Sequence, residues 1–266
     1  MRTIAIMNNK GGVGKTVTAI NLADILSRGY GRRVVLADCD GQMNLTRFFL
    51  PEFDPEQHVS VADVLIGEGE AVWEDNLLDL PDGLRLLPGS SALYGLDLDA
   101  VQNGLEFSWA LDEFSEAMAE DDGADYLFFD CPPGFTAASV AALMAADIVV
   151  IPTTVDGFSI SGMKALADQI KLLRTTRPGI KIGGVLITQW HNSDVVRQGE
   201  QLLRSMGVPV YEKVIRRTDK VPESTFDRNP IVKYSPTSAA SRDYLEWVCE
   251  FMIAVGDSPF GLAGED

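Results

Sequence analysis

Short apolar runs alternate with stretches of helical periodicity along almost the whole chain. We expect strands at residues 3–7, 33–37, 84–87, 126–129, 148–152 and 183–188. Between them, we expect helices that include residues 16–27, 108–119, 162–174 and 195–206. Strands that alternate with helices form a mostly parallel sheet with helices on both faces. Runs such as "YLFFD" and "DIVVI" are apolar at successive positions, so both faces of this twisted sheet should be buried.

The length and composition favour a single α/β domain. With 266 residues, 46% of them hydrophobic, the chain is able to bury one large core. We predict one domain over residues 1–256 and a frayed tail over residues 257–266. The chain has neither a signal-peptide pattern nor the apolar run of about 18 residues that spans a membrane, which predicts a cytoplasmic protein. Three scattered cysteines favour neither a disulfide framework nor a zinc site.

A glycine-rich sequence, "KGGVGKTV" at residues 10–17, follows the first expected strand and precedes the first helix. Glycines in this position let the backbone wrap around a phosphate, which amide groups at the helix N-terminus then bind. The sequence is a variant of the GxxxxGK[ST] motif, because Asn9 occupies the place of the first glycine. We expect Lys15 to contact the β- and γ-phosphates and the Thr16 hydroxyl to bind Mg²⁺. The predicted nucleotide-binding residues are Lys10, Gly11, Gly12, Val13, Gly14, Lys15, Thr16 and Val17.

Aspartates stand at the carboxyl ends of two expected strands. Asp38 and Asp40 occur in "VVLADCDGQMNLT", after the second strand, and Asp130 ends the buried run "YLFFD". Ligands of open α/β sheets bind at this edge. Asp130 has the position of a Walker B carboxylate, which holds Mg²⁺ or its water ligands. The sequence therefore predicts a metal site formed by Thr16, Asp38, Asp40 and Asp130.

These motifs resemble those of a known family. "KGGVGKT", "DCDGQMNLT" and "FFDCPPG" are similar to the three nucleotide motifs of the ParA/MinD family of deviant Walker A ATPases, and most of all to its short, Soj-like ParA branch. The likeness continues through "ADIVVIPTTVDGFSISGM" and "VIRRTDKVPESTFDRNPIVKYSPTSAASRDYL", so it covers nearly the whole chain. The resemblance implies a P-loop NTPase fold, ATP and Mg²⁺ as cofactors, and ATP hydrolysis that is weak without a partner.

The resemblance also implies roles for particular residues. The lysine that matches Lys10 is the signature lysine of the family, which crosses the interface of an ATP-bound homodimer and contacts the other subunit's nucleotide. A second cation stabilises the charge that phosphoryl transfer gathers on oxygen atoms. Lys10, Lys15 and Asp40 are therefore the expected catalytic residues, with Asp40 beside the attacking water. Three positions depart from the family pattern, which has threonine, proline and proline there: Val17, Gly41 and Arg216.

Charge is distributed unevenly along the chain, whose net charge is −17. Residues 51–130 contain 21 acidic residues and one basic residue, whereas residues 160–235 contain 13 basic residues and 7 acidic ones. Charges are screened over about 8 Å at physiological salt, so a basic face is able to act locally on an acidic protein. The acidic segment would then face away from a bound duplex. The alternative is that both segments are ordinary solvated faces.

The basic segment contains candidate DNA contacts. Arg217 and Lys220 match positions at which ParA relatives contact the DNA backbone, and Arg216 adjoins them after the strand-like "VYEKVI". No aromatic residues interleave with this cluster, which favours phosphate contact without sequence reading. We therefore predict non-specific DNA binding through Arg216, Arg217 and Lys220. An ordinary exposed cluster is the alternative.

The predicted function is DNA partition. On this hypothesis the protein dimerises on ATP, associates with nucleoid DNA, and is released when a ParB-like activator stimulates hydrolysis. The alternatives are a related ATPase that positions a protein cargo and a P-loop enzyme that acts on a small substrate. Membrane binding is not expected, because residues 236–266 hold one basic and six acidic residues, whereas a MinD-like membrane helix is basic. Cys39 and Cys131 lie inside the nucleotide motifs, which favours buried thiols over an iron–sulfur site.

Overall fold

The computed structural model describes residues 1–67, 73–103, 109–121 and 123–259. In these ranges seven strands form one sheet, in the order β3-β4-β2-β5-β1-β6-β7. Neighbouring strands are parallel, except that β3 is antiparallel to β4. The mostly parallel sheet expected from the sequence is therefore confirmed. The strands are β1 (Arg2–Ile6), β2 (Val34–Asp38), β3 (Leu78–Asp79), β4 (Leu84–Leu87), β5 (Tyr126–Asp130), β6 (Ile148–Thr153) and β7 (Lys181–Ile187).

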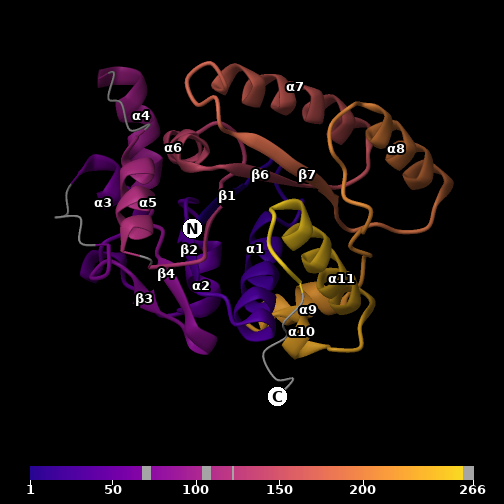
Figure 1. Ribbon diagram of the computed structural model, residues 1–266, viewed down its shortest axis with the longest axis horizontal. Coiled ribbons are helices and arrows are strands. Elements are labelled where there is room, and N and C mark those ends of the chain that lie inside the picture. The colour runs from indigo at the N-terminus through magenta and orange to yellow at the C-terminus, as the bar shows by residue number, and fades with distance from the viewer. Residues whose placement is uncertain (68–72, 104–108, 122, 260–266) are drawn as a thin grey trace.

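Helices cover both faces of this sheet (Figure 1). On one face the core includes residues of α3, α4, α5, α6, α7 and α8, and on the other residues of α1, α2, α10 and α11. The helix α1 continues directly into a π-helical turn at Ile25–Gly29. The helices are α1 (Lys15–Asp24), α2 (Asn44–Phe49), α3 (Val61–Ile66), α4 (Leu93–Asn103), α5 (Ala110–Glu120), α6 (Ala137–Ala145), α7 (Gly157–Leu173), α8 (Asp194–Ser205), α9 (Lys220–Phe226), α10 (Ile231–Tyr234) and α11 (Ala239–Ala254).

The central strands are buried on both sides, as their apolar sequences predict. In β1, Ile4 and Ala5 pack into the cores on opposite faces of the sheet, and in β2 Leu36 and Val35 do the same. Each of these four side chains is fully buried. Side chains of successive strand residues point to opposite faces, so a strand must be apolar at every position when helices cover both faces.

The segment "VYEKVI", at residues 210–215, is not a strand, so the sequence interpretation is wrong there. It follows the edge of β7 through single contacts: the Tyr211 amide donates to the Val185 carbonyl (3.0 Å) and the Ile215 amide to the Ile187 carbonyl (2.8 Å). Between these contacts the amides of Glu212 and Lys213 donate to the Glu250 carboxylate, at 2.7 and 3.1 Å. These bonds to α11 replace the ladder that a strand would form.

Asp257, the first residue of the predicted tail, has hydrogen-bond partners elsewhere in the fold. The Asp257 carboxylate binds the Arg32 guanidinium through two hydrogen bonds, of 2.8 and 3.0 Å, and accepts a third from the Tyr126 hydroxyl. This carboxylate therefore joins the first residue of the predicted tail to β5. Residues 260–266 lie outside the described residues.

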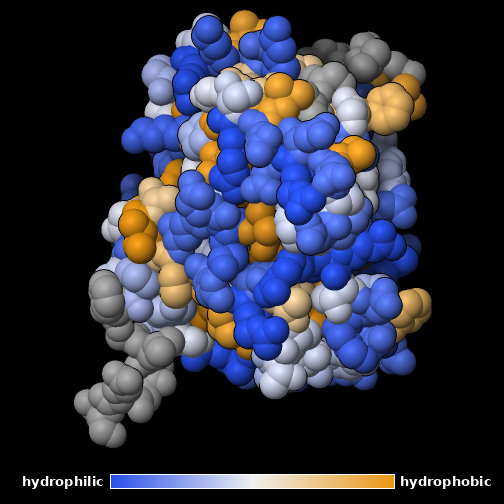
Figure 2. Space-filling view, turned by 90° about the vertical axis from the view of Figure 1, so that its right-hand side faces the viewer, coloured by the Kyte–Doolittle hydropathy of each residue, from blue (hydrophilic) through white to orange (hydrophobic). Residues whose placement is uncertain are grey.

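The topology places parts of the two charged segments at opposite edges of the sheet, although the ion pairs Arg177–Asp112 and Lys233–Asp82 join them elsewhere. The acidic residues 51–130 include β3 and β4 at one edge of the sheet, and β7, followed by α8, lies at the opposite edge (Figure 1). Viewed from the β7 side, the surface is mostly hydrophilic, with scattered hydrophobic residues (Figure 2). Across the described ranges, every helix is too short or too polar to cross a bilayer.

Candidate nucleotide site

The glycine-rich loop joins β1 to α1 at the carboxyl edge of the sheet. Gly12 and Gly14 have φ angles of 72° and 87°, a left-handed conformation that glycine adopts without strain. Gly14 is the N-cap of α1 and provides no side-chain cap. The first amides of a helix lack partners within the helix, and together with the helix dipole they form an anion site. The loop therefore has the conformation of a phosphate-binding loop.

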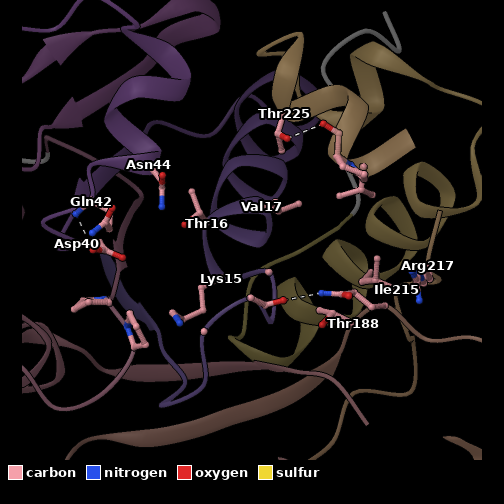
Figure 3. A pocket seen from close by; sticks show the side chains of 18 of the residues that line it. Lys15, Thr16, Val17, Asp40, Gln42, Asn44, Thr188, Ile215, Arg217 and Thr225 are labelled. Atoms are coloured by element: carbon pink, nitrogen blue, oxygen red, sulfur yellow. Dashed lines mark hydrogen bonds between the residues drawn. The ribbon is translucent and has the colours of Figure 1, made fainter. Parts of the chain in front are cut away.

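Lys15 lies in this loop with its ammonium group buried. Nζ donates hydrogen bonds to the carbonyl oxygens of Asn8 (3.2 Å) and Lys10 (3.1 Å). Burial lowers the pKa of Lys15, and the nearby Asp130 carboxylate opposes this shift. Figure 3 shows Lys15 and Thr16 directed into the cavity on the side where Asp40 lies. The carbonyl groups of the loop thus hold the positively charged Lys15 ammonium beside the loop.

A cavity of about 780 Å³ extends from this loop, as Figure 3 shows. Ligand pockets for small molecules and cofactors have volumes of about 300–1,000 Å³. One side of the cavity is formed by the loop after β2 and the start of α4, and the other by the chain after β7 and by α9. Near the glycine-rich loop its lining includes Gly11, Gly12, Gly14, Lys15, Thr16, Val17, Asp40, Gln42 and Asn44. Its far end includes Ile215, Arg216, Val221, Pro222, Thr225 and Tyr244.

Not every residue of the predicted nucleotide set lines the cavity. Val13 is buried, and its carbonyl accepts a hydrogen bond from the Thr188 hydroxyl (2.7 Å), which ties the loop to the end of β7. Gln189, which follows Thr188, donates a hydrogen bond from its side-chain amide to the Gly12 carbonyl (2.7 Å). Lys10 lies outside the cavity lining and next to a smaller hollow. Val17 does line the cavity.

Asp38 and Asp130 are register partners at the ends of β2 and β5. Asp38 accepts hydrogen bonds from the Thr46 hydroxyl (2.7 Å), the Thr46 amide (2.8 Å) and the Asp40 amide (3.2 Å). Burial raises the pKa of Asp38 to about 6, although these hydrogen bonds oppose the shift. Asp38 is therefore placed to hold the loop after β2, and its oxygen atoms already have donors.

Asp130 differs from Asp38. Both of its carboxyl oxygens are buried, and neither has a hydrogen-bond partner within the described residues. Burial raises the pKa of Asp130 well above its ordinary value, and the neighbouring Asp38 carboxylate adds to the shift, while the nearby Thr16 hydroxyl opposes it. A buried carboxylate that is not fully hydrogen-bonded is costly unless a cation compensates it. This environment fits a divalent cation near Asp130 and the Thr16 hydroxyl.

The donor set suits a cation that takes most of its ligands from phosphate and water. In the described parts of the chain, no group of three or more His, Cys, Asp or Glu residues forms a metal site by itself. Mg²⁺ in phosphoryl-transfer sites is typically held by one or two protein groups together with phosphate oxygens and water. Asp130 and Thr16 fit as these protein ligands better than Asp38 does, because the carboxyl oxygens of Asp38 already accept hydrogen bonds.

Asp40 lies at the edge of the cavity in a tight turn (Figure 3). Its Oδ1 atom accepts a hydrogen bond from the Gln42 amide (2.9 Å), and its carbonyl oxygen accepts one from the Met43 amide (2.8 Å). Met43 has a φ of 55°, which is unusual for a residue with a side chain. The turn thus directs the Asp40 carboxylate toward the cavity opposite Lys15.

Lys10 points away from the cavity within its own chain. Its ammonium group contacts the Asp156 carboxylate and also donates to the hydroxyls of Thr154 and Ser159, each at 3.3 Å. Burial alone would raise the pKa of Asp156, but hydrogen bonds from Lys10 and Ser159 hold it well below its ordinary value. Sequence reasoning missed Asp156 and Ser159, because only the fold brings the end of β6 next to the loop.

The three basic candidates have different surroundings. Arg216 binds the buried Asp243 through its guanidinium, with contacts of 2.6 and 2.8 Å, and this hydrogen bonding raises the pKa of Arg216. Lys220 pairs with Glu223 at 2.6 Å. The Arg217 side chain is exposed and forms no ion pair with any other described residue, while its amide donates to the Trp190 carbonyl (2.8 Å). Of the three, Arg217 has the guanidinium best placed to contact a ligand.

Comparison with known proteins agrees with these features. A family described as "AAA domain" matches residues 1–182. The chain is 33% identical over 249 residues to the chromosome partitioning protein ParA of Caulobacter vibrioides, with 92% of each chain covered. It is 31% identical over 261 residues to the chromosome-partitioning ATPase Soj of Thermus thermophilus, with 97% of this chain and 98% of that protein covered.

A solved structure shares both the fold and part of the sequence. The structure described as cobyrinic acid a,c-diamide synthase from Mycobacterium smegmatis, with bound ADP and magnesium, has a TM-score of 0.76 and 28% identity. The match covers 93% of this chain and 92% of that one. The fold is therefore that of a P-loop NTPase, as the motifs predicted. With its glycine-rich loop, its aspartates and these relatives taken together, the chain belongs to the ParA/MinD family of deviant Walker A ATPases.

Proposed function

We propose that this protein is an ATP-dependent partition ATPase that hydrolyses ATP with Mg²⁺. The observation that carries the proposal is the arrangement of Lys15 and Thr16 opposite Asp40, with the unpartnered Asp130 carboxylate beside them. The relatives named as partitioning proteins support partition as the process that ATP hydrolysis serves.

The residues of this site have separate tasks in hydrolysis. Lys15 and the loop amides would bind the β- and γ-phosphates, and the Thr16 hydroxyl and Asp130 would hold Mg²⁺ or its water ligands. A Mg²⁺ ion held there would neutralise phosphate charge. Asp40 orients the attacking water toward the phosphate, because its carboxylate is directed into the cavity. Asp38 keeps the Asp40 turn in place through the amide of Asp40.

Dimerisation completes the site in this proposal. Two chains associate when each binds ATP, and Lys10 of one chain contacts the nucleotide of the other. In the single chain Lys10 is held by Asp156, so it must leave this partner before it serves another subunit. Hydrolysis then depends on assembly, which explains a weak basal rate and makes ATP a switch as well as a substrate.

Non-specific DNA is the proposed polymer partner, and a ParB-like protein the proposed activator. Arg217 is exposed and lines the cavity after β7, at the sheet edge opposite β3 and β4. Arg216 and Lys220 remain proposed contacts, but each must share its charge with an acidic neighbour. We propose a cytoplasmic protein that associates with the nucleoid in its ATP-bound state and has no membrane partner.

One experiment tests this function. ATP turnover is measured with and without random-sequence duplex DNA, and DNA binding is measured by fluorescence anisotropy in ATP and in ADP. We expect similar affinity for several unrelated duplexes in ATP and weak binding in ADP. A protein that hydrolyses ATP but binds no DNA at low salt would contradict the partition proposal.

Two other functions would use the same nucleotide site. The likeness to the structure described as cobyrinic acid a,c-diamide synthase favours a P-loop enzyme that acts on a small substrate as the second candidate. Such an enzyme would turn over its small substrate and show no DNA stimulation. An ATPase that positions a protein cargo would still form the ATP-dependent dimer, and its cargo would replace the ParB-like activator.

A further inference from the structure

Tyr94 lies in the first turn of α4 and covers the turn that carries Asp40. A Cβ atom added to Gly41 would lie 2.9 Å from the Cε2 and Cζ atoms of the Tyr94 ring. The side-chain amide of Gln42 donates a hydrogen bond to the Tyr94 hydroxyl. Gly41 is buried, whereas Asp40 is half-buried and Gln42 is exposed. The tyrosine therefore contacts the turn through both its ring and its hydroxyl.

The chain that leads into α4 also packs against this turn. A Cβ atom on Gly89 would lie 2.9 Å from the Asp38 carbonyl oxygen and 3.2 Å from the Asp40 carbonyl oxygen. The Gly89 amide donates to the Thr46 hydroxyl (2.9 Å), which itself donates to the Asp38 carboxylate. The Asp40 turn is thus held on one side by this connection and on another by Tyr94.

Helix α4 also contacts the start of α6, which follows the loop after β5 and Asp130. Asp97, three residues after Tyr94, accepts a hydrogen bond from the amide of Ala137 (2.7 Å), the first residue of α6. The chain just before α6 lines the cavity through Pro132, Pro133 and Thr136. The first turns of α4 therefore join the loop after β2 to the loop after β5.

We propose that Tyr94 is a positioning residue for ATP hydrolysis, which restrains the Asp40 turn so that the carboxylate stays aligned with the attacking water. This inference rests on the ATPase function proposed above. The orientation of Asp40 depends on hydrogen bonds within a short turn. Tyr94 contacts Gly41 and Gln42, the two residues that follow Asp40 in this turn. Small displacements of a group that orients a reactant slow the reaction strongly.

Substitutions at Tyr94 separate positioning from binding. Tyr94→Ala should lower the single-turnover rate of ATP hydrolysis about tenfold and leave the Kd for ATP within about twofold of the parent. Tyr94→Phe keeps the ring over Gly41 and loses only the bond to Gln42, so it should recover most of the rate. Leu98→Ala is the matched control, because Leu98 is an exposed residue of α4 outside the cavity lining. It should hydrolyse ATP like the parent.

A double-mutant cycle with Gly41 tests the contact itself. Gly41 is not in the left-handed region, so its backbone accepts alanine and the conflict lies with the Tyr94 ring. Gly41→Ala should displace the ring and lower the rate as Tyr94→Ala does. The double variant should then be no slower than either single variant. Rate losses that multiply in the double variant would overturn the inference.

Amide hydrogen exchange measures the stability of the Asp40 turn and does not require the protein to hydrolyse ATP. In nucleotide-free protein the amides of Gln42 and Met43 are bonded to Asp40, and we expect Tyr94→Ala to speed their exchange while Leu98→Ala does not. Unchanged exchange in Tyr94→Ala would overturn the role of Tyr94 whether or not the parent hydrolyses ATP. A parent that shows no ATP turnover would instead contradict the proposed function.

Discussion

The ammonium group of Lys10 lies against the carboxylate of Asp156, which is also the N-cap of α7. Oδ1 of Asp156 accepts hydrogen bonds from the amides of Phe158 (3.0 Å) and Ser159 (2.9 Å), and Oδ2 faces Lys10. Asp156 therefore joins the glycine-rich loop to the start of α7. In the single chain Lys10 is held by a charged partner of its own, so a role at another subunit requires that this pair break.

Lys10→Ala should separate nucleotide binding from assembly. The variant retains Lys15 and the loop amides, so ATP binding measured with a fluorescent analogue should be close to that of the parent. ATP-dependent dimerisation, followed by sedimentation velocity, and activator-stimulated hydrolysis should be lost. Lys15→Ala is the comparison, and it should lose nucleotide binding itself. A Lys10→Ala protein that dimerises and hydrolyses ATP normally would show that Lys10 is only a loop residue.

Asp156→Asn should favour the ATP-bound dimer. Asparagine also caps helices well, so the start of α7 is kept while the charge that holds Lys10 is removed. Partly exposed ion pairs contribute about 0.2–1 kcal/mol each. Two such pairs break when one dimer forms, so the dimerisation midpoint should shift by up to about 2 kcal/mol, or roughly thirtyfold. Sedimentation over a range of protein concentrations in ATP measures this shift. Weaker dimerisation would indicate that Asp156 itself contributes to the interface.

Asp40→Ala should slow hydrolysis without preventing ATP binding. The substitution removes the carboxylate that faces the cavity, while Lys15, Thr16 and Asp130 keep their contacts with phosphate and Mg²⁺. The protein should therefore accumulate as an ATP-bound dimer, which gel filtration in ATP and Mg²⁺ detects. A variant that stays monomeric in saturating ATP would count against a role confined to hydrolysis.

Asp257→Asn should lower the stability of the fold in a pH-dependent way. Burial opposes ionisation of Asp257, but hydrogen bonds from Tyr126 and Arg32 lower its pKa below the ordinary value of 3.8. Because the folded-state pKa is the lower one, the contribution to stability is present above about pH 4 and is lost as the pH falls further. Charged hydrogen bonds contribute about 1–3 kcal/mol, so the variant should melt a few degrees lower at pH 7. The difference in Tm from the parent should shrink toward pH 3.

Much of the sheet could be predicted from the sequence, because strands buried on both faces are apolar at every position. The expected strand at residues 84–87 has the same bounds as β4, and the other expected strands agree within two residues. Helix α4 was not predicted, since Gly95, Asp97 and Asp99 interrupt its apolar periodicity. Tyr94 was missed with it.

The phosphate loop could be predicted because its chemistry lies in consecutive residues. Side-chain partners from distant segments could not be predicted from the sequence. Asp156 is 146 residues from Lys10 along the chain, and Asp243 is 27 residues from Arg216. The sequence places three basic residues together but does not reveal which of them already has a buried acidic partner. That difference between Arg216 and Arg217 appears only once α11 packs beside the chain that follows β7.

Arg217→Ala should weaken DNA binding with little effect on folding. An ATP-bound dimer presents two copies of Arg217, so the loss of two phosphate contacts should reduce the slope of log affinity against log salt by about 1.8. The reduction should be similar for unrelated duplexes, because phosphate contacts carry no sequence information. Dimerisation and basal hydrolysis should be unchanged. Arg216→Ala is the contrasting variant, since it leaves the buried Asp243 carboxylate without its cation and should lower the Tm. If Arg217→Ala binds DNA with the salt dependence of the parent, the DNA surface lies elsewhere on the molecule.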